Sequence, residues 1–236
     1  MKIKAAVVKE VGAPFEIKDD VELHDVGPTD LQIHMVASGI CHSDEAIRRG
    51  DASLGYPVIL GHEGAGIVEK VGSEVKNFKP GDHVILSFYS DGTCDNCLKG
   101  VPTQCRSYAK YNLSGVRADG DDHFTENGKH VSDMFNQSSF TTTTVVDQRN
   151  AVKVDSKLDL RKLGPLGCGY VTGSGTVFNT LKRSTSFLKG LNLPKSLAQR
   201  MRSTARKKIR LKRSRSLPAV MASTGPLIRQ GFRPSS

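Results

Sequence analysis

The chain has 236 residues, of which 25% are charged and 37% hydrophobic, enough for one domain with a real core plus an extension. No run of about eighteen apolar residues occurs, which excludes a transmembrane helix, and the N-terminus lacks the apolar stretch of a secretory signal. The composition therefore predicts a soluble, cytoplasmic protein.

The net charge of +10 is distributed unevenly along the chain. Residues 183–236 hold 14 of the 34 lysines and arginines and no acidic residue. The other 20 lysines and arginines and all 24 acidic residues lie in residues 1–182, which therefore carry a net charge of −4. We therefore divide the chain into a mildly acidic globular domain, residues 1–182, and a basic tail, residues 183–236.

Short strands separated by glycine and proline turns are predicted in the first 90 residues. Residues 2–8, 15–26 and 31–36 alternate apolar and polar side chains, and two further strands are expected at residues 66–70 and 83–87. A short helix is expected directly after Cys41, where Ser43, Asp44 and Glu45 are typical of a helix start. This pattern predicts a barrel or sandwich and not a doubly wound sheet.

The rest of the chain is less regular. Residues 91–136 are polar and predicted as loop, residues 140–153 return to strand, and a helix is expected from Leu158 to about Leu181. In the tail, residues 196–213 could form a basic amphipathic helix, and disorder is expected beyond residue 214. The tail is interpreted as a frameshift product, with a genuine extension that binds nucleic acid or an anionic membrane surface as the alternative.

Five cysteines stand at positions 41, 94, 97, 105 and 168. Their odd number, without an export signal, argues against a disulfide framework, and three of them cluster in one short segment. Reduced thiolates that bind a metal are the better interpretation. The alternative for the isolated positions is that Cys41 and Cys168 are buried apolar residues and His62 is a core histidine.

Several separate motifs occur in a fixed order. Residues 61–72 read GHEGAGIVEKVG and are preceded by GICHSD at 39–44, and FKPGDHV at 78–84 and LGCGYVTG at 166–173 follow. Together they resemble the zinc-dependent medium-chain alcohol dehydrogenase family, with the aryl- and benzyl-alcohol dehydrogenases as the nearest branch. The resemblance covers residues 1–182 and implies a mainly β domain with short helices, the partly open GroES-like barrel of the catalytic domain.

The resemblance implies a catalytic zinc site with Cys41, His62 and Cys168 as ligands. Two thiolates and one imidazole are a known ligand set for a zinc ion that keeps one position open. By the same resemblance, Glu63 lies behind the metal, and Asp44 orients the His62 imidazole, although a helix-start role for Asp44 is nearly as well supported.

The family also implies roles for three residues around this site. Ser43 would receive the alcohol proton, His42 would lie near the cofactor pyrophosphate, and Thr172 would face the nicotinamide. The best-known members continue the proton relay through a histidine three residues after the serine, where this chain has Ala46. The relay would then pass through water or another group.

A second, structural zinc site is implied at Asp91, Cys94, Cys97 and Cys105. The family has cysteine at the first of these positions, and this chain has Asp91. Because zinc accepts carboxylate oxygen, the four residues could still close a tetrahedral site. The alternative is a degenerate site that retains its metal weakly.

The family's nucleotide-binding domain is missing from the sequence. A Rossmann domain needs a G-x-G-x-x-G turn after a buried strand, whereas Gly173-Ser174-Gly175 lacks the third glycine and no acidic residue follows Asp159. The predicted function is thus an alcohol dehydrogenase that ends before its nucleotide-binding domain. It would act with NAD(P) on a small primary alcohol or the corresponding aldehyde, with aromatic alcohols as the narrower expectation. The alternatives are a non-catalytic zinc-binding module and a basic-tailed protein that binds nucleic acid or an anionic surface. A homo-oligomer is also expected, since apolar surface around residues 166–181 would be exposed.

Overall fold

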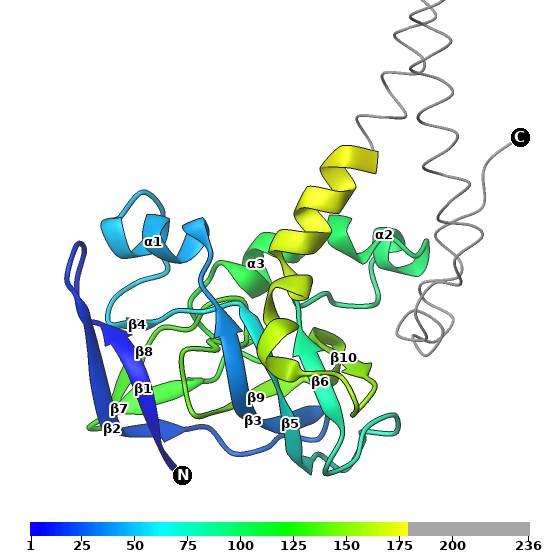
Figure 1. Ribbon diagram of the computed structural model, residues 1–236. Coiled ribbons are helices and arrows are strands. Elements are labelled where there is room, and N and C mark those ends of the chain that lie inside the picture. The colour runs from blue at the N-terminus through cyan, green and yellow to red at the C-terminus, as the bar shows by residue number, and fades with distance from the viewer. Residues whose placement is uncertain (179–236) are drawn as a thin grey trace, which may run out of the picture.

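The computed structural model describes residues 1–178, and the tail segments discussed above lie outside this range. The strands in chain order are β1 (Lys2–Val8), β2 (Phe15–Leu23), β3 (Asp30–Gly39), β4 (Val58–Ile59), β5 (Glu63–Val71), β6 (His83–Leu86), β7 (Phe124–Glu126), β8 (Lys129–Val131), β9 (Thr143–Asp147) and β10 (Ala151–Val154). The α-helices are α1 (His42–Arg49), α2 (Asp95–Leu98) and α3 (Tyr108–Asn112), and the 3-10 helices are η1 (Pro102–Gln104), η2 (Gln148–Asn150), η3 (Leu160–Lys162) and η4 (Gly164–Gly167). Residues 169–178 form a further helix, which leaves the barrel in Figure 1.

The strands form two five-stranded sheets, in the orders β4-β1-β2-β7-β8 and β10-β6-β5-β3-β9. All of their strand pairs are antiparallel. Residues 140–142 connect the sheets, because the amide of Ala6 in β1 donates to the Phe140 carbonyl and the amide of Met35 in β3 donates to the Thr142 carbonyl. The result is a partly open β-barrel with short helices, which confirms the fold that the family resemblance implied.

Alternation along the strands builds the barrel core. Ile3, Val21 and Phe124 pack together inside the first sheet, and Leu31 and Val84 belong to a matching cluster in the second. Each of these side chains is at most 4% exposed. Period-two patterning therefore selects the buried face of β1 and β6, whereas β3, β5 and β9 each begin with four consecutive buried residues.

Three segments differ from the sequence-based prediction. Residues 91–136 are not a plain loop, since they contain α2, η1, α3 and the hairpin β7–β8, each too short to show a periodicity. The strand expected at 140–153 is interrupted by η2, where the Asp147 carboxylate accepts a hydrogen bond from the Arg149 amide at 2.8 Å. The helix expected from Leu158 begins only at residue 169, after η3 and η4, because Gly164, Pro165 and Gly167 stand in its first part.

Within residues 1–178, no helix is both long and apolar enough to cross a bilayer.

Candidate metal centres

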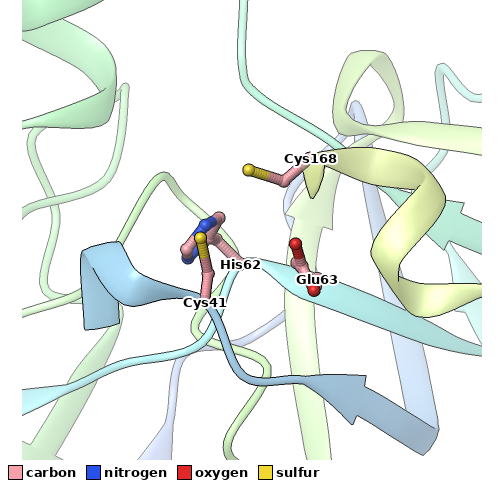
Figure 2. Close-up of side chains that lie close together, drawn as sticks. All are labelled: Cys41, His62, Glu63 and Cys168. Carbon is pink, nitrogen blue, oxygen red and sulfur yellow. The ribbon is translucent and has the colours of Figure 1, made fainter. Parts of the chain in front are cut away.

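Four candidate ligands from distant parts of the chain meet at one end of the second sheet. Cys41 lies between β3 and α1, His62 and Glu63 lie at the start of β5, and Cys168 follows η4. One ligand atom from each lies within 4.8 Å of the others, and Figure 2 shows the four side chains around a common point. The structure thus brings together the three predicted zinc ligands and the predicted carboxylate behind them.

Asp44 holds the Cys41 and His62 segments together. Its carboxylate accepts hydrogen bonds from the Cys41 amide at 2.7 Å and the Gly61 amide at 3.0 Å, and its Oδ1 lies 3.1 Å from Nδ1 of His62. Asp44 and His62 are at most 1% exposed. Both functions weighed for Asp44 from the sequence therefore have a contact here, one at the helix start and one to the imidazole.

The His62 ring is left with one unused nitrogen. With Nδ1 bonded to Asp44, the lone pair of Nε2 is available, and Nε2 is buried without a hydrogen-bond partner among the residues that the structure describes. A buried imidazole nitrogen of this kind needs a partner, and a metal ion beside two thiols satisfies it. The residues present therefore fit a zinc ion.

The two thiols of this cluster have different pKa values. Burial opposes ionisation of Cys41, but hydrogen bonds from Ser43, together with the electrostatic effect of the His62 imidazole, outweigh it and lower the pKa of the thiol. Burial, together with the negative charge of Cys41 and Glu63, raises the pKa of Cys168 to about 12. A divalent cation would remove this repulsion, because metal binding favours the thiolate.

Glu63 is turned toward the segment that carries Cys168. Its Oε1 accepts a hydrogen bond from the Gly169 amide at 3.0 Å, and its side chain fills the space that a Cβ on Gly39 would need. Glu63 is 4% exposed, so its carboxylate is buried beside the cluster.

The remaining predicted residues lie within a few positions of Cys41 or Cys168 in the chain. Ser43 is half-buried, with its Oγ 3.8 Å from Sγ of Cys41. His42 and Thr172 are exposed, and the Thr172 amide donates to the Cys168 carbonyl at 2.9 Å within the first turn of the helix at 169–178. Ala46, at the position of the family's relay histidine, is half-buried on α1.

The second predicted cluster also assembles. Asp91, Cys94, Cys97 and Cys105 place one ligand atom each within 4.8 Å of the others. Oδ1 of Asp91 accepts hydrogen bonds from the amides of Thr93 and Cys94, both at 2.9 Å, which leaves the other carboxylate oxygen available. The same amide bonds lower the pKa of Asp91, whereas burial and the adjacent Cys94 raise the pKa of Cys97 to about 12.

Aromatic side chains beside His62 were not predicted from the sequence. Its ring is 5.0 Å from that of Phe135 and 6.4 Å from that of Phe88, and Phe88 lies 5.8 Å from Tyr108. Phe88 directly follows a predicted strand, which was the only available signal. Phe135 and Tyr108 fall in a polar segment without periodicity.

The described fold and clusters agree with comparisons to known proteins. Residues 27–156, just over half of the chain, match the family model of the alcohol dehydrogenase GroES-like domain, and the chain belongs to this family. Geraniol dehydrogenase of Castellaniella defragrans is 42% identical over 180 residues, which cover 75% of this chain and 48% of that protein.

Two solved structures are similar over the same region. The alcohol dehydrogenase zinc-binding domain protein of Burkholderia ambifaria has 38% identity and a TM-score of 0.74, covering 77% of this chain and 50% of that one. Benzyl alcohol dehydrogenase of Acinetobacter calcoaceticus has 37% identity and a TM-score of 0.72, covering 77% and 49%. The chain spans about half the length of these relatives.

Proposed function

We propose that this chain is the zinc-binding, substrate-activating part of an alcohol dehydrogenase that transfers a hydride between a small primary alcohol and a nicotinamide nucleotide. The observation that carries the proposal is the cluster of Cys41, His62 and Cys168. Nε2 of His62 is buried without a hydrogen-bond partner among the described residues, which indicates that it binds a metal. Membership of the family supports the reaction class.

Each side chain around the Cys41–His62–Cys168 cluster has a separate role in this proposal. Cys41, His62 and Cys168 would hold a zinc ion, which when bound supplies Lewis-acid chemistry for an alcohol oxygen. Ser43, whose Oγ lies 3.8 Å from Sγ of Cys41, would accept the hydroxyl proton and pass it to water, since Ala46 offers no further group. Asp44 fixes the His62 ring, and Glu63 fixes the start of the helix that follows Cys168.

A second zinc ion would be held by Asp91, Cys94, Cys97 and Cys105. Each supplies one ligand atom, and four protein ligands are typical of a closed structural zinc site. We infer that the exposed residues His42 and Thr172 face the nicotinamide nucleotide. The substrate class we propose is an alcohol or aldehyde with an apolar group, since Phe88 and Phe135 lie beside His62.

Metal analysis of the purified protein, combined with NAD(P)H titration followed by fluorescence, tests this proposal. We expect close to two zinc ions per chain, one for each cluster, and single losses in Cys41→Ser and in Cys105→Ser. Absence of zinc would refute the metal assignments. Two zinc ions without nucleotide binding would leave the chain as a zinc-binding module by itself, whereas micromolar nucleotide binding would favour a complete coenzyme site.

A further inference from the structure

The backbone just after β6 is held largely by side-chain amides. β6 ends at Leu86; after it, the Ser87 hydroxyl donates to the Gly167 carbonyl at 3.2 Å and the Phe88 ring lies 6.4 Å from that of His62. The Ser87 carbonyl accepts hydrogen bonds from Nε2 of Gln137 and Nδ2 of Asn150, each at 3.2 Å. Buried peptide groups require partners, so these amides take the place of a neighbouring strand.

Asn112 binds Tyr89 on both of its peptide groups. Oδ1 of Asn112 accepts from the Tyr89 amide at 3.0 Å, and Nδ2 donates to the Tyr89 carbonyl at 2.9 Å. Nδ2 also donates to the Tyr108 carbonyl at 3.0 Å. The residue is 1% exposed, so its amide is used inside the protein, where only a side chain with both a donor and an acceptor can replace it.

Phe88 lies between the two anchored residues, Ser87 and Tyr89. Its ring packs edge-on against Phe135 at 5.1 Å and against Tyr108 at 5.8 Å, and it stacks near the His62 imidazole at 6.4 Å. Burial is the main cause that raises the pKa of the Tyr108 hydroxyl, and Cys168 adds to it. Phe88 and Tyr108 therefore form an aromatic wall that reaches the His62 imidazole through the Phe88 ring.

The same contacts connect this wall to the second cluster. The Tyr108 amide donates to the Cys105 carbonyl at 3.1 Å, so α3 begins directly on the segment that supplies a ligand. Asn112 ends this helix and binds the strand end that carries Phe88. It is the side chain through which α3 contacts both peptide groups of Tyr89.

We propose that Asn112 is a positioning residue, which fixes Phe88 and Tyr108 as the wall that receives the apolar group of the alcohol. This inference rests on the proposed function, since it assumes an alcohol at the open position of the Cys41–His62–Cys168 site. Without the amide, Tyr89 loses two buried hydrogen bonds and the Phe88 ring is free to shift. The consequence is a loss of preference among alcohols, while the ligands themselves stay in place.

The test uses the full chain loaded with cobalt(II), whose visible ligand-field bands respond to an alcohol only at a site with an open position. Benzyl alcohol and ethanol are titrated into the unaltered protein, Asn112→Ala, and Asn96→Ala. Asn96 is the matched control. Its Nδ2 also donates to a backbone carbonyl, that of Gln104, within the segment 91–112 that contains Asn112, but it contacts no part of the wall. Cobalt content verifies that each variant retains both clusters.

In Asn112→Ala we expect benzyl alcohol binding to weaken about threefold to tenfold relative to ethanol, the range that loss of aromatic contacts gives. Asn96→Ala should keep the ratio of the unaltered protein. In a Phe88→Leu background, Asn112→Ala should cause no further loss of selectivity, because Asn112 acts through that ring. A general loss of stability would not produce this pattern.

Each contrary outcome has a distinct meaning. Absence of any alcohol response in the unaltered protein overturns the proposed function and this inference together. A normal response with an unchanged benzyl-to-ethanol ratio in Asn112→Ala overturns the role of Asn112 alone. If Asn112→Ala does not fold, the isosteric Asn112→Asp, which keeps the acceptor but loses both donated bonds, decides the question on the same ratio.

Discussion

At the scale of single residues, the Cys41–His62–Cys168 cluster is held together by one carboxylate outside the candidate ligand set. Asp44 accepts the amides of Cys41 and Gly61 and contacts the imidazole of His62, so it joins two ligand segments that are 21 positions apart in the chain. Partners of this kind set the tautomer and the orientation of a ligating histidine.

We therefore expect Asp44→Ala to weaken zinc binding at the Cys41–His62–Cys168 site by about 10-fold to 100-fold, the range found for such partners. Competition with a chromophoric chelator measures the affinity. Asp44→Asn serves as the matched variant, since it keeps the shape and one acceptor oxygen, and it should lose less. Zinc affinity in Asp44→Ala equal to that of the unaltered protein would show that the imidazole is oriented by packing alone.

At the scale of elements, the position of Cys168 depends on η4, which directly precedes it and packs closely against the backbone of the second sheet. A Cβ on Gly167 would stand 1.9 Å from the carbonyl oxygen of Leu86, and one on Gly164 would stand 2.3 Å from that of Glu63. Both oxygens belong to strand backbone, which cannot withdraw. The Ser87 hydroxyl adds a hydrogen bond to the Gly167 carbonyl at 3.2 Å.

Gly167→Ala should accordingly push η4 away from β6, lower the free energy of unfolding by about 1–3 kcal/mol and remove one zinc equivalent. Urea denaturation and metal analysis measure the two effects. Gly173→Ala is the control, because no atom lies within 4 Å of its added Cβ and it stands in the helix at 169–178. That change should be neutral or stabilise by up to about 1 kcal/mol, and an equal loss in both variants would contradict the close-approach argument.

At the scale of the whole molecule, the helix at 169–178 presents apolar side chains to solvent. Tyr170, Val171 and Val177 are 63%, 57% and 56% exposed, and Ile40 near the metal cluster is 84% exposed. Figure 1 shows this helix, in yellow, extending away from the barrel and not lying on it. Apolar side chains gathered on one element in this way usually become buried in an interface.

We expect the protein to self-associate through this helix, and the double variant Val171→Ser, Val177→Ser to shift it toward monomer. Sedimentation velocity across a range of concentrations measures the change. Leu98→Ser is the control, because Leu98 is 73% exposed on α2 and belongs to a different surface. A single monomeric species of 25.6 kDa at all concentrations would contradict the expectation.

Much of the barrel could be predicted because its information is local. Alternating side chains in residues 2–8 and 31–36 select the buried face of β1 and β3, and the residues around His62 form one contiguous motif. The candidate metal ligands could also be predicted from the sequence, since cysteine and histidine in these motifs have few other uses. Family membership and the fold class followed from the same residues.

Only the tertiary structure could show the contacts between segments that are far apart in the sequence. The contact of Asp44 with Nδ1 of His62 spans 18 positions, and the hydrogen bonds between Asn112 and Tyr89 span 23. That Nε2 of His62 is buried without a partner among the described residues could also be learned only from the packing. Neither periodicity nor spacing encodes such contacts, because they depend on how strands of different sheets and short helices pack. For the same reason the elements of residues 91–136, each only three to five residues long and so too short to repeat a pattern, could be seen only in the fold.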